Sequence, residues 1–276
     1  MRDFQRQDII LQALGREGIV HVNKLARRFQ VTPQTIRRDL ALLREQGLVQ
    51  RTHGGATRLM TTTHRDYQDR WRTLREEKQA IARQAAALIP DHCSVMLNIG
   101  TTTEQVARIL TAHQGLLVIS NNINIIQILS GSQHKLIIAG GVVRSGDGAI
   151  VGPEASSFLA GYKADYAVIG GSSIDPDGAV LDYDSQEVTV AQTILQNART
   201  KILVADVSKF NQRAPVRICQ VADLDYVVFD APPPPTFALA AEQGGTKIVI
   251  ASAIHEADHK LADESESSVQ THSPSA

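Results

Sequence analysis

Seven short apolar runs alternate with helical patterns through the last two thirds of the chain, and this alternation constrains the fold more than any other feature. The runs are "SVMLNIG", "LLVISNN", "KLIIAGG", "DYAVIGG", "KILVADVS", "DYVVFDA" and "KIVIAS". Helical patterns occupy residues 102–113, 122–130, 153–162 and 185–198. Continuous Val/Ile/Leu strands separated by helices are typical of a parallel sheet covered on both faces, so we expect an α/β domain over residues 75–252.

The stretch "NIGTTTEQVARIL" joins the first of these strands to a helix through Gly100 and three threonines. Threonine is favoured at helix starts without any ligand, so capping is one interpretation. The other is an anion site, because glycine allows a tight turn and the first amides of a helix are free to bind a negative group. This stretch alone does not decide between them.

Other strand ends favour the anion site. Ligands of parallel sheets bind at the carboxyl ends of the strands, and here several of these ends carry small or hydroxyl residues. Any one such turn is explained by ordinary turn geometry. Together with Lys209 in "DVSK" they favour a phosphorylated small molecule held by amides, hydroxyls and one cation. The candidate ligand-binding residues are Asn98, Gly100, Thr101, Thr102, Thr103, Asn121, Asn122, Gly140, Gly141, Gly170, Glu187 and Lys209.

Glu187 is included for a different reason from the others. It belongs to the acidic segment "LDYDSQE", near a predicted helix start where carboxylates are favourable with no ligand present. In an enzyme such a carboxylate would act as a general base, whereas in a sensor it would accept hydrogen bonds from ligand hydroxyls. We interpret Glu187 as a hydroxyl contact.

Residues 1–58 form a separate, basic domain in this interpretation. Residues 1–60 carry 11 Lys and Arg against 5 Asp and Glu, whereas the other 216 residues carry 17 against 24. This asymmetry suggests that the N-terminal part alone meets a polyanion. Apolar residues recur at helical spacing in "MRDFQRQDIILQAL" and "KLARRF", and Asn23 is predicted to cap the second of these helices.

A third helix, "PQTIRRDLALLREQG", is predicted to have Thr32 as its cap, Pro33 as its first residue and a buried stripe of Ile36, Leu40 and Leu43. Three short helices with a tight turn before the third are typical of a helix-turn-helix, whose last helix enters the major groove by its N-terminal residues. The alternating segment "LVQRTHGGATRL" then predicts a β-hairpin wing. The candidate DNA-binding residues are Thr32, Gln34, Thr35, Arg37, Arg38, Arg51, His53 and Arg58.

The segment "VTPQTIRRDLALLREQGLVQRTHGGA" closely resembles the DNA-recognition segment of DeoR-type bacterial transcriptional regulators. The resemblance extends to about residue 250. It implies a winged helix-turn-helix followed by a sensor domain whose fold is like that of ribose-5-phosphate isomerase. The resemblance also implies that this sensor domain binds phosphorylated sugars or polyols. It also implies that the phosphate loop is "NIGTTTE" and that "DVSK" supplies the lysine.

Three further segments, "DGAIVG", "LDYDSQEV" and "FDAPPPP", resemble the branch of this family that regulates glycerol-3-phosphate metabolism, which makes that compound the first candidate effector. Two segments depart from this branch. "GGSSID" stands where members of this branch usually have Gly-Ile-Ser-Gly-Ile-Asp. "SKFNQRAP" lacks the glycine that usually follows Ser-Lys-Phe in those members. A related sugar or polyol phosphate therefore remains an alternative.

The remaining features set limits on the class of protein. Residues 59–74 are predicted to be a linker, and residues 253–276 a disordered tail of low apolar content. No apolar run approaches the roughly 20 residues of a membrane span and no signal peptide is apparent, so we expect a cytoplasmic protein with no membrane partner. Cys93 and Cys219 form no metal-like cluster and the histidines are scattered, so neither a metal nor another cofactor is expected.

Two functions are compatible with this organisation. The first is a repressor of a carbon-utilisation operon that a phosphorylated metabolite releases from operator DNA; because one small head reads few base pairs, such a repressor is expected to be a homodimer or tetramer. The second is an active sugar-phosphate isomerase with an accessory DNA-binding head, which fold resemblance does not exclude. We favour the non-enzymatic repressor, because a DNA-binding head suits a sensor and the sequence shows no clear acid–base pair.

Overall fold

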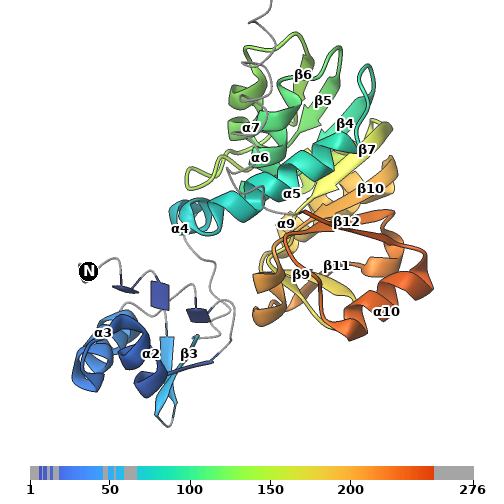
Figure 1. Ribbon diagram of the computed structural model, residues 1–276. Coiled ribbons are helices and arrows are strands. Elements are labelled where there is room, and N and C mark those ends of the chain that lie inside the picture. The colour runs from blue at the N-terminus through green and yellow to red at the C-terminus, as the bar shows by residue number, and fades with distance from the viewer. Residues whose placement is uncertain are drawn as a thin grey trace, which may run out of the picture.

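A computed structural model describes residues 6–7, 9–10, 13–14, 19–45, 49–52, 54–58 and 67–251. We call the part up to residue 58 the head and the part from residue 67 the sensor domain (Figure 1). The predicted tail of residues 253–276 lies outside the described residues. The elements of the head are β1 (Ile19–His21), α2 (Val22–Phe29), α3 (Pro33–Glu45), β2 (Val49–Thr52) and β3 (Gly55–Arg58).

The head has the predicted helix-turn-helix and wing. Helix α3 begins at Pro33, and the Thr32 hydroxyl accepts a hydrogen bond from the Thr35 amide at 3.2 Å, which confirms the predicted cap. Strands β2 and β3 pair antiparallel as the wing, and β1 adds a strand that the sequence analysis did not anticipate. The predicted cap at Asn23 is wrong: α2 begins one residue earlier, and His21 occupies the cap position with extended backbone.

One compact cluster of apolar residues holds the head together. Ile36, Leu40 and Leu43 are at most 2% exposed, which confirms the predicted stripe of α3. They pack with Ile10 and Leu14, two buried helical residues near the N-terminus. A buried ion pair adds to this core, since the Nε atom of Arg6 lies 2.6 Å from Oδ2 of Asp39 on α3. The apolar stripe thus leaves the opposite side of α3 exposed.

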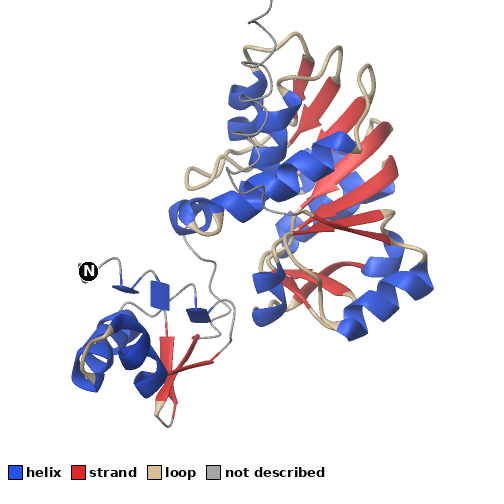
Figure 2. Ribbon diagram, viewed as in Figure 1, coloured by secondary structure: helices blue, strands red, loops and turns tan. Residues whose placement is uncertain are grey.

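In the described part of the sensor domain, seven parallel strands form one sheet in the order β13-β12-β10-β7-β4-β5-β6 (Figure 2). Every one of the seven apolar runs contributes a strand, so the predicted parallel sheet is confirmed. The strands are β4 (Ser94–Leu97), β5 (Leu117–Ser120), β6 (Lys135–Ile138), β7 (Ala164–Ile169), β10 (Ala198–Val204), β12 (Tyr226–Phe229) and β13 (Lys247–Ile250).

Helices cover both faces of this sheet, as the alternating pattern predicts. One hydrophobic cluster lies beneath α5 (Arg75–Ala87), α6 (Thr101–Leu110) and α7 (Ile123–Leu129). A second lies beneath α8 (Pro153–Ala160), α9 (Ser185–Gln196) and α10 (Pro235–Gly244). The remaining helices are α4 (Tyr67–Arg72) and the short 3-10 turns η1 (Val207–Asn211) and η2 (Val221–Asp223). Helix α4 lies inside the stretch expected to be linker.

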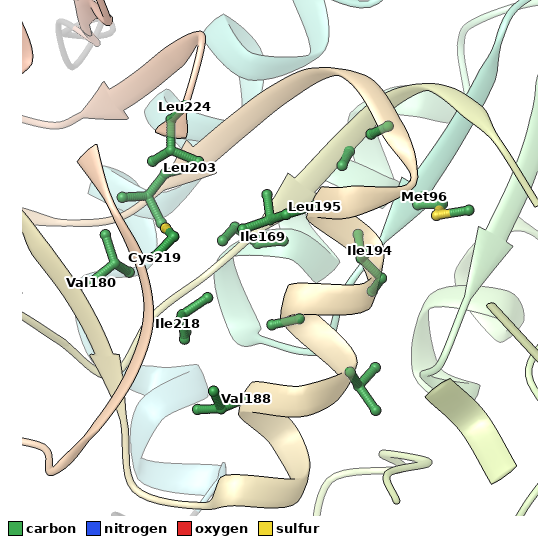
Figure 3. Packing of buried hydrophobic residues seen from close by; sticks show 14 of the residues in the cluster. Met96, Ile169, Val180, Val188, Ile194, Leu195, Leu203, Ile218, Cys219 and Leu224 are labelled. Carbon is green, nitrogen blue, oxygen red and sulfur yellow. The ribbon is translucent and has the colours of Figure 1, made fainter. Parts of the chain in front are cut away.

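A small antiparallel sheet, which the sequence analysis did not predict, packs on the other side of α9. Its strands are β8 (Ser173–Ile174), β9 (Ala179–Asp182) and β11 (Val216–Gln220), in the order β11-β9-β8. Figure 3 shows apolar side chains of α9 lying between the two sheets. The labelled members of this cluster are Met96, Ile169, Val180, Val188, Ile194, Leu195, Leu203, Ile218, Cys219 and Leu224.

Candidate ligand-binding and nucleic-acid-binding sites

A cleft of about 670 Å³, counted with its opening to solvent, lies at the carboxyl ends of the central strands. Nine of the twelve predicted ligand-binding residues line it. The complete lining is Tyr67, Arg70, Asn98, Ile99, Gly100, Thr101, Thr102, Thr103, Asn122, Asp147, Gly170, Gly171, Ser172, Asp182, Glu187, Ala191, Val204, Lys209 and Ile218.

The N-terminus of α6 forms one wall of the cleft. Gly100 precedes the helix with φ of 141°, a conformation that favours glycine, and no side chain caps the helix. The first amides of a helix have no partner within it. The Thr103 hydroxyl donates to the Gly100 carbonyl at 2.7 Å, so this threonine supports the turn. Thr101 and Thr102, each 7% exposed, line the cleft beside these amides.

Lys209 reaches the cleft from η1, which the buried Asp206 carboxylate and the half-buried Asp230 carboxylate position. The Asp206 carboxylate accepts from the Ser208 amide at 3.2 Å, and the Asp230 carboxylate accepts from the Val207 amide at 2.8 Å. Burial raises the pKa of Asp230, and the neighbouring Asp206 charge adds to this rise. The aspartate of the "DVSK" motif thus holds the turn, while its lysine lines the cleft.

Asn98, at the end of β4, contributes a polar atom without a partner. Its side chain is 5% exposed, and within the described part of the chain its Oδ1 atom makes no hydrogen bond. Its backbone amide donates to the Val168 carbonyl at 3.0 Å, which fixes its position in the sheet. Buried polar side chains are normally hydrogen-bonded, so an unsatisfied one at a cleft indicates a place for a polar ligand.

An ion cluster centred on Arg144 lies beside the cleft, and two of its members, Asp147 and Glu187, line it. Arg144 binds Asp147 through two contacts, of 2.9 and 2.6 Å, and its NH1 atom lies 2.5 Å from Oε1 of Glu187. Burial works against ionisation of Asp147, but the Arg144 guanidinium lowers its pKa below the usual range. The hydrogen bond to Asp147 in turn raises the pKa of Arg144. The sequence analysis did not identify Arg144 or Asp147 as site residues, although Asp147 opens the segment "DGAIVG" in the loop between β6 and α8.

Helix α4 is fastened to the first turn of α6. The Tyr67 hydroxyl donates to Oε2 of Glu104 at 2.7 Å, and the Asn124 amide group donates to Oε1 of Glu104 and to the Tyr67 hydroxyl, both at 3.0 Å. Burial raises the pKa of Glu104 and, with the nearby Glu104 carboxylate, that of Tyr67. Tyr67 and Arg70 of this helix line the cleft, which the sequence analysis missed.

The three other predicted ligand-binding residues do not line this cleft. Asn121 is fully buried and its side chain donates to the Ile150 carbonyl at 3.0 Å. Gly140 and Gly141 follow β6, the edge strand of the sheet, whereas the cleft lies at its centre. Asn122 does line the cleft, yet its side chain also caps α7 by accepting from two backbone amides.

The exposed side of α3 carries the predicted DNA-reading residues. Gln34, Arg37 and Arg38 are exposed, and NH1 of Arg37 lies 3.5 Å from Oε1 of Gln34. Thr32 and Thr35 form the helix cap and lie at the same end of α3. In the wing, Arg51 lies on β2 and Arg58 on β3, and His53 lies outside the described residues.

The described residues contain neither a cluster suited to a metal ion nor a membrane-spanning helix. Among them, no three His, Cys, Asp or Glu side chains come together as a metal site would require. Likewise, none of the helices within the described ranges has the length and apolar character needed to cross a membrane.

Comparison with known proteins assigns both parts of the chain to one family. Residues 6–62 match the model of the DeoR-like helix-turn-helix domain, and residues 74–231 match the DeoR C terminal sensor domain. The chain is 39% identical over 235 residues to the glycerol-3-phosphate regulon repressor of Escherichia coli (strain K12), covering 85% of this chain and 93% of that protein. It is 36% identical over 246 residues to the HTH-type transcriptional repressor CsqR of the same organism, covering 89% and 94%.

Solved structures share only part of the fold. Ribose 5 phosphate isomerase A from Neisseria gonorrhoeae aligns over 54% of this chain and 57% of its own, with 12% identity and a TM-score of 0.37. A likeness this partial carries no argument about the reaction or the ligand.

Proposed function

Because this chain belongs to the DeoR family, we propose that it is a transcriptional repressor whose head binds operator DNA and whose cleft binds a phosphorylated metabolite that releases the DNA. Relatives named as repressors align along most of the chain, head and sensor domain included. The proposal places the protein in the cytoplasm with the genes that it regulates.

The main support for a phosphorylated ligand is the set of groups that line the cleft at the N-terminus of α6. Unpaired helix amides, the buried hydroxyl residues Thr101 and Thr102, and Lys209 converge there. A phosphate group satisfies such a set well, because it accepts several hydrogen bonds and carries charge that favours the helix N-terminus. The unpaired Oδ1 of Asn98 adds a polar contact that a hydroxyl of the same ligand can satisfy.

Glycerol-3-phosphate is the specific effector we propose. A short polyol phosphate has an anionic end for α6 and hydroxyls for the carboxylates of Asp182 and Glu187, which also line the cleft. Glu187 is already paired with Arg144, and a carboxylate has further lone pairs with which to accept a hydroxyl hydrogen bond. The relatives that carry this compound in their names support the choice.

On the DNA side, we propose that α3 enters the major groove. Gln34 and Arg37 at its N-terminal end have side chains that can read adenine and guanine edges. Arg51 and Arg58 of the wing would then contact phosphates. Because one head covers few base pairs, we propose a symmetric dimer or tetramer on repeated half-sites.

An enzymatic role is the second candidate, and a direct assay separates it from the first. Purified protein is incubated with ribose-5-phosphate, glycerol-3-phosphate and hexose phosphates while product formation and melting temperature are followed. The repressor proposal predicts a raised melting temperature with one phosphorylated compound, since the ligand binds the folded state, and no product. Sustained turnover would establish the isomerase instead.

A further inference from the structure

Helix α4 brings a second cation to the cleft from outside the segment that matches the sensor family model. The matching segment begins at residue 74, whereas Arg70 lies on α4 and lines the cleft. The side chain of Arg70 is 20% exposed. Its Nε atom is buried and, within the described residues, has no hydrogen-bond partner.

The two carboxylates that interact with the charge of Arg70, those of Asp147 and Glu104, are hydrogen-bonded to other groups. Its NH2 atom lies 3.7 Å from Oδ2 of Asp147, beyond hydrogen-bond distance. Asp147 is already bound at two points by Arg144, and that arginine also engages Glu187. Arg144 is thus bound to carboxylates, while Arg70 lines the cleft and has a buried Nε donor without a partner among the described residues. A guanidinium is well suited to a phosphate, because its planar donors match two phosphate oxygens at once.

We infer that Arg70 is a direct ligand of the effector's phosphate group, completing a site formed by the α6 amides and Lys209. The inference rests on the proposed function, because it assumes a phosphorylated ligand in this cleft. It assigns a role in binding to α4, which lies in the stretch that the sequence analysis expected to be a linker.

Binding of the phosphate by Arg70 would also couple the cleft to the release of DNA. Tyr67 fastens α4 to Glu104, which lies in the same first turn of α6 that faces the phosphate. A phosphate that binds both the α6 amides and Arg70 stabilises one placement of α4 against α6. Because α4 lies between the head and the rest of the sensor domain along the chain, we propose that a change in its placement is passed to the head. The effector then shifts the equilibrium by its preference for that placement.

The experiment uses the full-length chain and the variants Arg70→Ala, Arg70→Lys and Arg72→Ala. Arg72 is exposed on the same helix and serves as the matched control. Calorimetric titration with glycerol-3-phosphate, with inorganic phosphate as a second probe, gives the affinity. Anisotropy of a labelled operator duplex gives DNA binding with and without the compound. Melting temperature without ligand verifies folding, and Arg70→Lys provides a milder change if Arg70→Ala is poorly folded.

We expect Arg70→Ala to weaken glycerol-3-phosphate binding about 10- to 100-fold, as befits a charge-assisted hydrogen bond, and Arg70→Lys to weaken it less. The concentration that releases DNA should rise by the same factor, while DNA affinity without ligand stays unchanged. Arg72→Ala should bind like the unmodified chain. If the unmodified chain responds to the compound and Arg70→Ala responds equally, the inference is wrong and the proposed function stands. If the unmodified chain binds no phosphorylated compound, both are wrong.

Discussion

The head and the sensor domain build their sites in opposite ways. In the head, the side chains proposed to read DNA lie within the first turns of one helix, α3, whose cap and buried stripe are neighbours in sequence. In the sensor domain, the cleft takes its lining from residues as far apart as Tyr67 and Ile218. A local site is set by helical periodicity, whereas a dispersed site exists only after the sheet has formed.

This difference implies that the two activities can be damaged separately. A change in α3 should remove DNA binding and leave ligand binding intact, and a change in the cleft should do the reverse. The following predictions test that separation, beginning with the largest expected effect.

The largest effect is expected in the core of the head. Ile36 is fully buried, so Ile36→Ala should cost about 2–5 kcal/mol, which is a large share of the stability of so small a domain. Operator binding should be lost while the sensor domain melts as before. Calorimetry of the full chain measures this, with Leu42→Ala, at a 41% exposed position of the same helix, as the control. A parallel loss of sensor-domain stability would show that the two domains do not fold separately.

Lys209→Ala tests the opposite half of the comparison. Loss of this cation should weaken binding of the phosphorylated effector by about 1.5–3 kcal/mol, as for a hydrogen bond to a charged group. DNA affinity without effector should not change. Isothermal titration and operator anisotropy on the same sample give both values. Release at the normal effector concentration would remove Lys209 from the site.

Arg37→Ala should reduce discrimination between operator and unrelated duplex by about 1–3 kcal/mol, the worth of a good contact to a base edge. Effector binding should be unaffected. Competition binding with the two duplexes measures the ratio, and Arg44→Ala at the far end of α3 is the control. A variant that still selects its operator would contradict the proposed docking of α3.

The smallest effect concerns acid stability of the cleft wall. The pKa of Asp147 is lowered in the folded state, so its ion pair with Arg144 stabilises the fold above the ordinary carboxyl range. That contribution is lost as the pH falls through the lowered pKa. Asp147→Asn should therefore melt at a lower temperature at neutral pH and decline less steeply below pH ~4. Glu242→Gln, at an exposed position, should keep the unmodified profile.

The same contrast explains what the sequence could predict. All seven parallel strands are predicted by apolar runs in the sequence. The candidate ligand-binding residues at their ends, such as Asn98 and Gly100, follow from the rule that ligands bind at the carboxyl ends of parallel strands. The Thr32 cap and the α3 stripe follow from local spacing. Asn23 was misplaced because a favourable cap residue sits one position inside a helix that begins earlier.

The missed features depend on long-range pairing. Strand β8 has two residues, and β11 pairs with β9 across more than thirty positions, so neither carries a readable period. Asp147 opens the segment "DGAIVG", but nothing in that segment or at Arg144 indicates an ion pair, and only the folded chain brings the two residues to Glu187. Arg70 and Tyr67 lie in a polar stretch without a steady apolar period, where a linker is the natural interpretation.

One titration tests the central claim most directly. The full-length protein is bound to a fluorescent operator duplex selected from a random-sequence pool, and glycerol-3-phosphate, pentose phosphates and hexose phosphates are added in turn. The account predicts that anisotropy falls to that of free DNA with one of these compounds, and that the Lys209→Ala complex resists the same concentration. Anisotropy that stays unchanged with every compound, or a Lys209→Ala complex released as easily as the unmodified one, would contradict it.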